Sequence, residues 1–244
     1  MVVSDGRVAE NGSVPSREPL DVLEAMATTR AIRRYRPEPI PEADLAAMCF
    51  AASRAPSGSN RQQFRFLVLT DGPKAVKAKA ILGRAFRAGW EEKRSADGYA
   101  TGSGSVPDSP KARQAAAMQH FVDHFEETPA VFLACLIRYR PETGTEGASV
   151  YPAVQNLLLA GRALGYGGVI TMWHQTVERE LRELLGIPAG VAISATIPMG
   201  RPMGSHGPVR RRPVAEFAYA DEWGNPAPWA LDPPGTTFAF PKRR

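Results

Sequence analysis

Two short segments near the N-terminus gather the side chains best suited to binding a phosphorylated ligand. The segment Thr29–Tyr35 carries Arg30, Arg33 and Arg34 just after a predicted helix, and Ala55–Gln62 is a polar turn before an apolar run. Guanidinium groups bind phosphate through charged, often bidentate hydrogen bonds. A turn rich in proline, serine, glycine and asparagine exposes hydroxyls, an amide and backbone groups. Together the segments predict a site for a phosphorylated cofactor with many hydrogen-bonding atoms.

A third cationic segment follows the last predicted strand and carries Arg210 and Arg211 just before a proline. A phosphate dianion in a partly dry pocket needs more than one cation, and arginines from distant segments also fix its position. The alternative interpretation of all these arginines is a solvated charge run or a cluster that aids solubility.

Composition sets wide bounds on the function. Hydrophobic residues make up 43% of the 244-residue chain, which supports a sizeable core and argues against a mostly disordered protein. The net charge of +5 suits phosphate, nucleic acid or a membrane surface. Because two of the arginine clusters border segments that look folded, a discrete anion site is favoured over a diffuse nucleic-acid face.

The remaining features point to a cytoplasmic protein without a metal site. Residues 1–18 lack the apolar core of a signal peptide, and no apolar run approaches the ~20 residues of a membrane span. Cys49 and Cys135 lie in apolar stretches and are predicted to be buried free thiols. His120 and His124 share a helical face, but no further ligand cluster supports a metal there.

Hydrophobic periodicity predicts helices alternating with about four strands in one domain. The predicted helices are Pro19–Thr28, a second from Pro41, Lys74–Lys93, Lys111–Glu126, Val150–Leu164 and Val177–Leu185. The predicted strands are Phe66–Leu69, Ala130–Ile137, Gly168–Thr171 and Val191–Ile197. Between them, Ser95–Pro110 is rich in glycine, serine and proline and is predicted to be a mobile flap or lid.

Residues 20–216 resemble the FMN-dependent nitroreductase family in the order and spacing of several motifs. The matching positions are Arg30 and Arg33 in the first segment and Pro56, Ser57, Asn60 and Gln62 in the turn. The segment Tyr151–Gly165 is similar to the core helix of the family. The departures are Thr29, Ala31 and the pair Gln63-Phe64; alanine at position 31 removes a hydroxyl, although its backbone can still contribute.

The resemblance implies an FMN site and identifies its residues. The cofactor-binding residues that it implies are Arg30, Ala31, Arg33, Arg34, Pro56, Ser57, Gly58, Asn60, Gln62, Thr171, Met172, Trp173, Arg210 and Arg211. Residues 171–173 would offer backbone groups to the isoalloxazine ring, and the turn would reach the flavin of a partner chain. No catalytic acid–base residue is expected, since solvent can protonate the product.

The resemblance also implies a fold and an assembly. It implies an α+β protein with a three-layer α/β/α arrangement, a mostly antiparallel central sheet and an intertwined homodimer. The expected parts are a flexible lead at 1–18, an FMN-binding domain at 19–216 with a variable substrate lid at about 84–118, and an extension at 217–244 that wraps the partner. Trp90 and Tyr99 are predicted to stack over substrate; the alternative is that they pack on the neighbouring helix.

The implied function is an oxidoreductase that passes hydride from NADH or NADPH through FMN to an electron-poor small molecule, such as a nitroaromatic or a quinone. Its mechanism would be ping-pong. An FMN-binding protein for sequestration or sensing, without nicotinamide turnover, is the main alternative, and a basic nucleic-acid-binding protein is a more distant one. Reductive dehalogenation, flavin destruction and dehydrogenation stay open as related chemistries.

Overall fold

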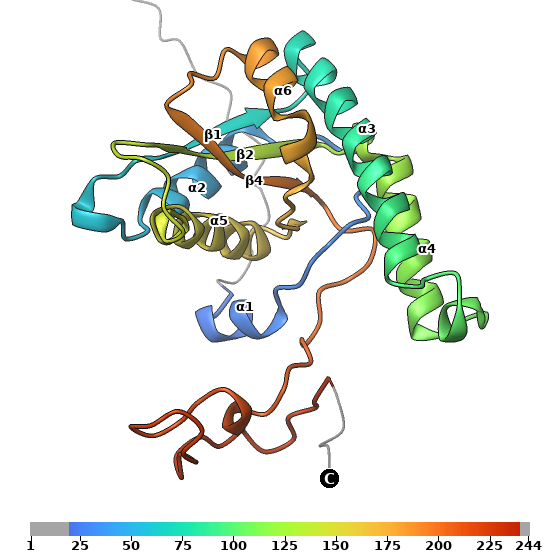
Figure 1. Ribbon diagram of the computed structural model, residues 1–244, viewed down its shortest axis with the longest axis vertical. Coiled ribbons are helices and arrows are strands. Elements are labelled where there is room, and N and C mark those ends of the chain that lie inside the picture. The colour runs from blue at the N-terminus through green and yellow to red at the C-terminus, as the bar shows by residue number, and fades with distance from the viewer. Residues whose placement is uncertain (1–19, 240–244) are drawn as a thin grey trace, which may run out of the picture.

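The computed structural model describes residues 20–239, so the predicted lead at 1–18 and the last five residues lie outside it. The chain forms an antiparallel sheet with helices on both faces (Figure 1). The α-helices are α1 (Val22–Thr28), α2 (Glu42–Ser53), α3 (Pro73–Ala96), α4 (Pro110–Asp123), α5 (Tyr151–Ala163) and α6 (Glu178–Leu185). The strands are β1 (Phe64–Leu69), β2 (Ala130–Ile137), β3 (Gly167–Gly168) and β4 (Val191–Gly200).

The sheet has the order β1-β2-β4-β3, and every neighbouring pair is antiparallel. Side chains of β2 alternate between two hydrophobic clusters because successive residues of a strand point to opposite faces. Phe132 packs in the cluster with α2 and α5, whereas Val131 and Leu133 pack in the cluster with α3, α4 and α6. The predicted α+β class, the three layers and the antiparallel sheet are therefore confirmed for the single chain.

The third strand is shorter than the sequence predicts. Only Gly167 and Gly168 pair with β4, and the chain touches it again through an isolated bridge between Thr171 and Thr196. Between Gly168 and Thr171, the residue of β4 that faces the chain is Pro198. The Val169 N–H donates to the Pro198 carbonyl at 3.4 Å. Because proline has no N–H to return, the ladder breaks there.

Helices α3 and α4 form a long hairpin across one face of the sheet (Figure 1). The base of the hairpin is held by an ion pair between Arg87 and Glu126 at 2.7 Å. Glu126 reaches across Gly83, where a Cβ atom would lie 2.2 Å from its carboxylate. Residues 97–109 connect the two helices and contain a short 3-10 turn at Gly102–Ser105.

Residues 217–239 run away from the body of the domain (Figure 1). Their large apolar side chains are exposed: Trp223 is 93% exposed, Trp229 66% and Leu231 77%. Large exposed apolar surfaces mark interaction sites in soluble proteins. Within one chain, Trp223, Trp229 and Leu231 leave most of their side-chain surface in water.

Acidification is expected to destabilise the fold through His174. Its side chain is fully buried and its Nε2–H donates to the Ile193 carbonyl at 2.9 Å. Burial lowers the pKa of His174 below its ordinary value of 6.5, so below that pH the unfolded chain binds a proton that the native chain disfavours. The free energy of unfolding should fall by roughly 1 kcal/mol or more between about pH 7 and about pH 5.

Urea denaturation at the two pH values measures this effect. A His174→Gln variant should be less stable at neutral pH and should lose part of the pH dependence. An equally steep pH dependence in this variant would show that another group is responsible.

Candidate functional site

The arginine segment, Thr29–Tyr35, lies against the edge of the sheet formed by β3. The Ile32 N–H donates to the Gly168 carbonyl at 3.1 Å, and the Met203 N–H donates to the Arg34 carbonyl at 3.0 Å. Two of the segments predicted to hold the cofactor are therefore in direct contact. These are the arginine segment and the chain that leads from β3 to Thr171.

Gly167 and Gly168 allow the close packing of the arginine segment, β3 and β4. A Cβ atom on Gly167 would lie 2.4 Å from Ile32 Cγ1, and one on Gly168 would lie 2.8 Å from the Pro198 carbonyl oxygen. Real Cβ atoms do not approach other heavy atoms so closely. Glycine at position 167 therefore leaves room for Ile32 of the arginine segment, and glycine at position 168 lets β3 lie close to β4.

The side chain of Tyr35 ties the arginine segment to β4. Sequence analysis did not identify Tyr35 as a site residue. Its hydroxyl lies 2.5 Å from the Ile32 carbonyl oxygen and 3.0 Å from the Pro198 carbonyl oxygen. Burial raises the pKa of Tyr35 well above its ordinary value, so the phenol stays protonated and can donate. The only feature of the sequence that could have indicated this role is that Tyr35 is an aromatic residue within a run of arginines.

Replacing Tyr35 by phenylalanine should lower the free energy of unfolding by about 1–3 kcal/mol, because two buried carbonyls lose their shared donor. Thermal unfolding of Tyr35→Phe measures the loss. Tyr139→Phe is the matched control, since Tyr139 is 54% exposed and should tolerate the change. Equal unfolding temperatures for the two variants would contradict an anchoring role for the Tyr35 hydroxyl.

One group of cations lies where α1, α5 and the chain after β4 meet. The Val209 N–H donates to the Ala27 carbonyl at 3.0 Å, which brings the segment before Arg210 beside the start of the arginine segment. The Nε2–H of His206 donates to the Tyr166 carbonyl at 3.0 Å. Burial lowers the pKa of His206, and the charges of Arg162 and Arg30 lower it further.

These cations are available to an anion. Within residues 20–239, no carboxylate forms an ion pair with Arg30, Arg33, Arg34 or Arg210. Arg211 is also exposed, and its backbone pairs with the tail through a bridge to Phe238. Burial lowers the pKa of the Arg33 guanidinium, as expected for a cation that lacks a counter-charge in the chain.

The segment predicted to face the isoalloxazine ring places its residues in different environments. Thr171 and Thr196 exchange backbone hydrogen bonds at 2.9 and 3.0 Å, so the backbone of Thr171 is already paired. Its buried hydroxyl, however, has no partner among the described residues. Met172 is 37% exposed. The half-buried ring of Trp173 packs edge-on against Phe86 of α3, with centroids 5.0 Å apart.

The predicted turn, Pro56–Gln62, lies at the opposite end of the sheet. Its conformation is unusual: Ser59, Asn60 and Gln62 all have a positive φ of 50–52°. The turn is closed by the Gln62 N–H, which donates to Ser57 Oγ at 2.9 Å. Gly58 and Pro56 lie in the same exposed loop, which projects from the body beside β1 (Figure 1).

The separation of the turn from the arginine segment follows from the strand register. Residue Ile137 pairs with Val191 near the turn, and Ala130 pairs with Met199 near the arginine segment. At about 3.3 Å per residue, the two ends lie roughly 23 Å apart. One chain therefore does not bring the turn and the arginines to the same ligand.

The two predicted substrate residues line a cavity inside the helical hairpin. Trp90 is only 2% exposed, and its Nε1–H donates to Gln119 Oε1 at 2.9 Å. The half-buried ring of Tyr99 lies 5.1 Å from that of Trp90. Both residues border a cavity of about 280 Å³, together with Arg94 and small residues of α4. Trp90 is therefore a core residue with one face on a cavity, and not a surface aromatic.

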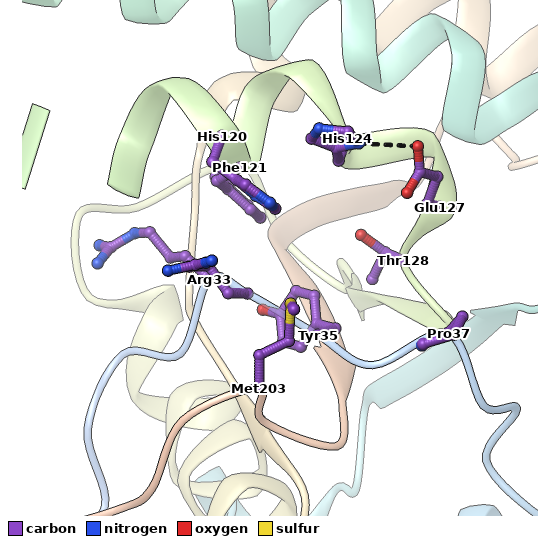
Figure 2. Close-up of a pocket in the computed structure, with 10 residues that line it drawn as sticks. Arg33, Tyr35, Pro37, His120, Phe121, His124, Glu127, Thr128 and Met203 are labelled. Carbon is purple, nitrogen blue, oxygen red and sulfur yellow. Dashed lines mark hydrogen bonds and ion pairs between the residues drawn. The ribbon is translucent and has the colours of Figure 1, made fainter. Parts of the chain in front are cut away.

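A second cavity, of about 240 Å³, lies between the arginine segment and the end of α4 (Figure 2). The rings of His120 and His124 lie 4.5 Å apart beside it, and His124 Nδ1 pairs with Glu127 at 2.8 Å. Within residues 20–239, no group of three or more metal-ligating side chains is present. The residues that line this cavity are Arg33, Arg34, Tyr35, Pro37, His120, Phe121, His124, Glu127, Thr128 and Met203.

This geometry fits a phosphorylated cofactor that also forms hydrogen bonds. Unpaired arginines from two distant segments suit a phosphate, and the unpartnered buried hydroxyl of Thr171 suits a polar ring edge. In the part of the chain that the structure describes, no helix is long and apolar enough to cross a membrane. Fold and site together describe an α+β domain whose sheet edge carries arginines without ion-pair partners and a buried hydroxyl without a hydrogen-bond partner among residues 20–239.

Comparison with known proteins identifies the family. The model of the nitroreductase family matches residues 26–201. The NADH dehydrogenase of Thermus thermophilus is 29% identical over 210 residues, which cover 80% of this chain and 93% of that protein. The iodotyrosine deiodinase of Thermotoga neapolitana is 25% identical over 173 residues, which cover 71% of this chain and 84% of that protein.

A solved structure agrees. A protein of Desulfovibrio desulfuricans, crystallised in complex with FMN and assigned as a nitroreductase, is 27% identical. Its TM-score is 0.60, and the alignment covers 84% of this chain and 99% of that chain. The chain belongs to the nitroreductase family. The resemblance noted in the sequence and the oxidoreductase class that it implies are thereby confirmed.

Proposed function

We propose that this chain is an FMN-dependent oxidoreductase that uses NADH or NADPH to reduce an electron-poor small molecule in a ping-pong cycle. The observation that carries the proposal is the hydrogen bond between Ile32 and Gly168, which places the unpaired arginines beside the strand that leads to Thr171. The relative crystallised with FMN supports the choice of cofactor.

Each segment would then have a separate task. Arg30 lies at the α1 end of the arginine segment, and the hydrogen bond from Val209 to Ala27 brings the chain before Arg210 to the same place. Arg30, Arg210 and Arg211 would therefore bind the phosphate. Arg33 would lie under the isoalloxazine ring, where a cation stabilises the negative charge that develops on reduction. Bound FMN would supply the hydride chemistry, and the protein would supply position and electrostatics.

The site is completed by a second copy of the chain in this proposal. The Pro56–Gln62 turn lies too far from the arginines of its own chain to share their ligand, so it would reach the flavin of the partner. The exposed tail at 217–239, with its two tryptophans, would cover the partner subunit. The homodimer, the lid over substrate and the cytoplasmic location stay predictions.

A visible absorption spectrum, followed by anaerobic addition of NADH and then NADPH, tests the proposal. A flavin spectrum that bleaches with either nicotinamide is the expected result. Bound flavin that neither nicotinamide reduces would favour a binding or sensing protein. A protein that neither contains nor takes up FMN would contradict the proposed function.

The acceptor can be narrowed by assay. Among the relatives is an iodotyrosine deiodinase, so halogenated phenols belong in the panel beside nitroaromatics and quinones. Turnover of a halogenated phenol with release of halide would move this chain to reductive dehalogenation.

A further inference from the structure

We propose that Arg61 and Arg140 bind the 2′-phosphate of NADPH, so that the chain takes hydride from NADPH in preference to NADH. The inference rests on the proposed function and deepens it by naming the donor. The observation behind it is a group of three side chains, Arg61, Tyr139 and Arg140, at the end of the sheet that carries the Pro56–Gln62 turn. These three residues are called the arginine–tyrosine cluster.

One aromatic ring collects two guanidinium groups in the arginine–tyrosine cluster. The guanidinium carbon of Arg61 lies 4.3 Å from the centre of the Tyr139 ring, and that of Arg140 lies 5.3 Å from it. The face of a tyrosine ring attracts cations, whereas the two guanidinium groups repel each other. An anion bound between them would remove this repulsion and accept hydrogen bonds from both.

The chain supplies no such anion from its own described residues. Within residues 20–239, no carboxylate forms an ion pair with Arg61 or Arg140. The nearby carboxylates of Glu142 and Glu146 both pair with Arg138, at 3.0 and 2.6 Å. Hydrogen bonds from Arg138 lower the pKa of Glu146, with a smaller contribution from the charge of Arg140. The cluster therefore keeps two positive charges for a ligand.

A small hollow beside the cluster offers further hydrogen-bonding groups. Tyr139 and Arg140 line it together with Thr145, Ser149 and the paired carboxylate of Glu146. Its volume of about 40 Å³ admits a few water-sized groups, which suits the oxygens of a phosphate and not a ring. Ser149 Oγ accepts the N–H of residue 58 at 3.4 Å, which leaves its own hydroxyl hydrogen to donate.

Backbone and side-chain hydrogen bonds fix the cluster to the predicted flavin-binding turn. The Ile137 N–H donates to the Gln63 carbonyl at 2.9 Å, and Gln63 Nε2 donates to the Ile137 carbonyl at 3.0 Å. Arg61 lies in the turn itself, between Asn60 and Gln62. In the proposed dimer this turn lies at the flavin of the partner, so the cluster would lie beside the place where a nicotinamide meets that flavin.

The phosphate of FMN does not account for these cations. It would be bound by Arg30, Arg210 and Arg211 near the other end of the sheet, roughly 23 Å away by the strand register. NADPH differs from NADH by the 2′-phosphate on its adenosine, for which a nearby arginine is the common partner. The planar guanidinium group also stacks on aromatic rings, which suits the adenine beside that phosphate. The pyrophosphate that both nicotinamides share is the competing source of negative charge.

Steady-state oxidation of NADPH and NADH by the FMN-loaded protein tests the assignment. The kcat/KM for NADPH should exceed that for NADH by about tenfold or more, as expected for hydrogen bonds between charged groups. Equal values for the two nicotinamides would overturn the proposal.

A variant pair locates the 2′-phosphate. Arg140→Ala should raise the KM for NADPH about tenfold and change the KM for NADH by no more than about twofold. Arg179→Ala, which removes an arginine of α6 whose side chain is 92% exposed, is the control and should change neither value. An equal rise for both nicotinamides in Arg140→Ala would place the shared pyrophosphate at the cluster, and no rise would remove Arg140 from donor binding; either result overturns the proposal.

Calorimetry with adenosine 2′,5′-bisphosphate and with 5′-AMP tests the same site without turnover. The bisphosphate should bind the FMN-loaded protein about tenfold more tightly than 5′-AMP, and Arg140→Ala should abolish the difference. Equal affinities in the unaltered protein would overturn the assignment. If neither nicotinamide reduces the flavin, the proposed function fails, and this comparison still decides whether the cluster binds the 2′-phosphate.

Discussion

Replacing Gly168 by alanine is expected to strip the protein of FMN and to lower its free energy of unfolding by about 1–3 kcal/mol. The new Cβ would lie 2.8 Å from the Pro198 carbonyl oxygen and 3.2 Å from side-chain atoms of Leu158 and Met199. A backbone atom cannot turn aside as a flexible side chain can. Strand β3 must therefore move, and the arginine segment bonded to it through Ile32 must move with it.

Thermal unfolding and the ratio of flavin to protein absorbance measure the two effects. Gly190→Ala is the matched control, because a Cβ there meets nothing within 4 Å. A Gly168→Ala protein that keeps its full flavin content would show that the register of β3 does not set the cofactor site.

Two inactive variants are expected to restore each other when they are mixed. One variant carries Arg30→Ala and Arg33→Ala, and the other carries Ser57→Ala and Asn60→Ala in the turn. If each flavin is bound by the arginines of one chain and the turn of its partner, a mixed dimer contains one doubly altered site and one wild-type site. Neither variant alone contains a wild-type site.

Co-expression with two different affinity tags isolates the mixed dimer for measurement of flavin content and NAD(P)H oxidation. Recovery of about one flavin per dimer is the expected result for a shared site of this kind. A mixed dimer as empty as its parents would show that the turn and the arginines act on the same chain's ligand. The control is a mixture of two arginine variants, which should recover nothing.

Sequence patterns predicted the elements whose boundaries are set locally. The helix predicted at Val150–Leu164 is observed at Tyr151–Ala163, because a proline starts it and Gly165, with a φ of +81°, ends it. The strand predicted at Gly168–Thr171 is mostly absent, because the interruption comes from Pro198 on the partner strand. A strand's own sequence does not reveal which residue will lie opposite it.

The candidate site also contains residues that the local sequence can indicate and residues that only tertiary packing brings together. The arginine segment was predicted from its composition and from its place just after a helix, because a solvated charge run has the same composition and only the position argues against it. Thr128 and His120 were not predicted to lie beside the arginine segment, because the fold brings them to the cavity at Arg33 from about 90 residues away along the chain. No local pattern marks a residue whose relevance arises only from tertiary packing.

The α3–α4 hairpin has a base that is fixed to the fold and a loop at its far end. This arrangement affects which parts of the chain can change without disturbing the sheet. The base is fixed to the fold by Arg87, Glu126 and the space above Gly83, whereas Gly102–Ser105 lies at the far end. Insertions and substitutions in that loop leave the sheet and the arginine segment untouched. We therefore expect a mutant library in this loop to change the walls of the cavity beside Trp90 and Tyr99 without moving β3 or the arginine segment.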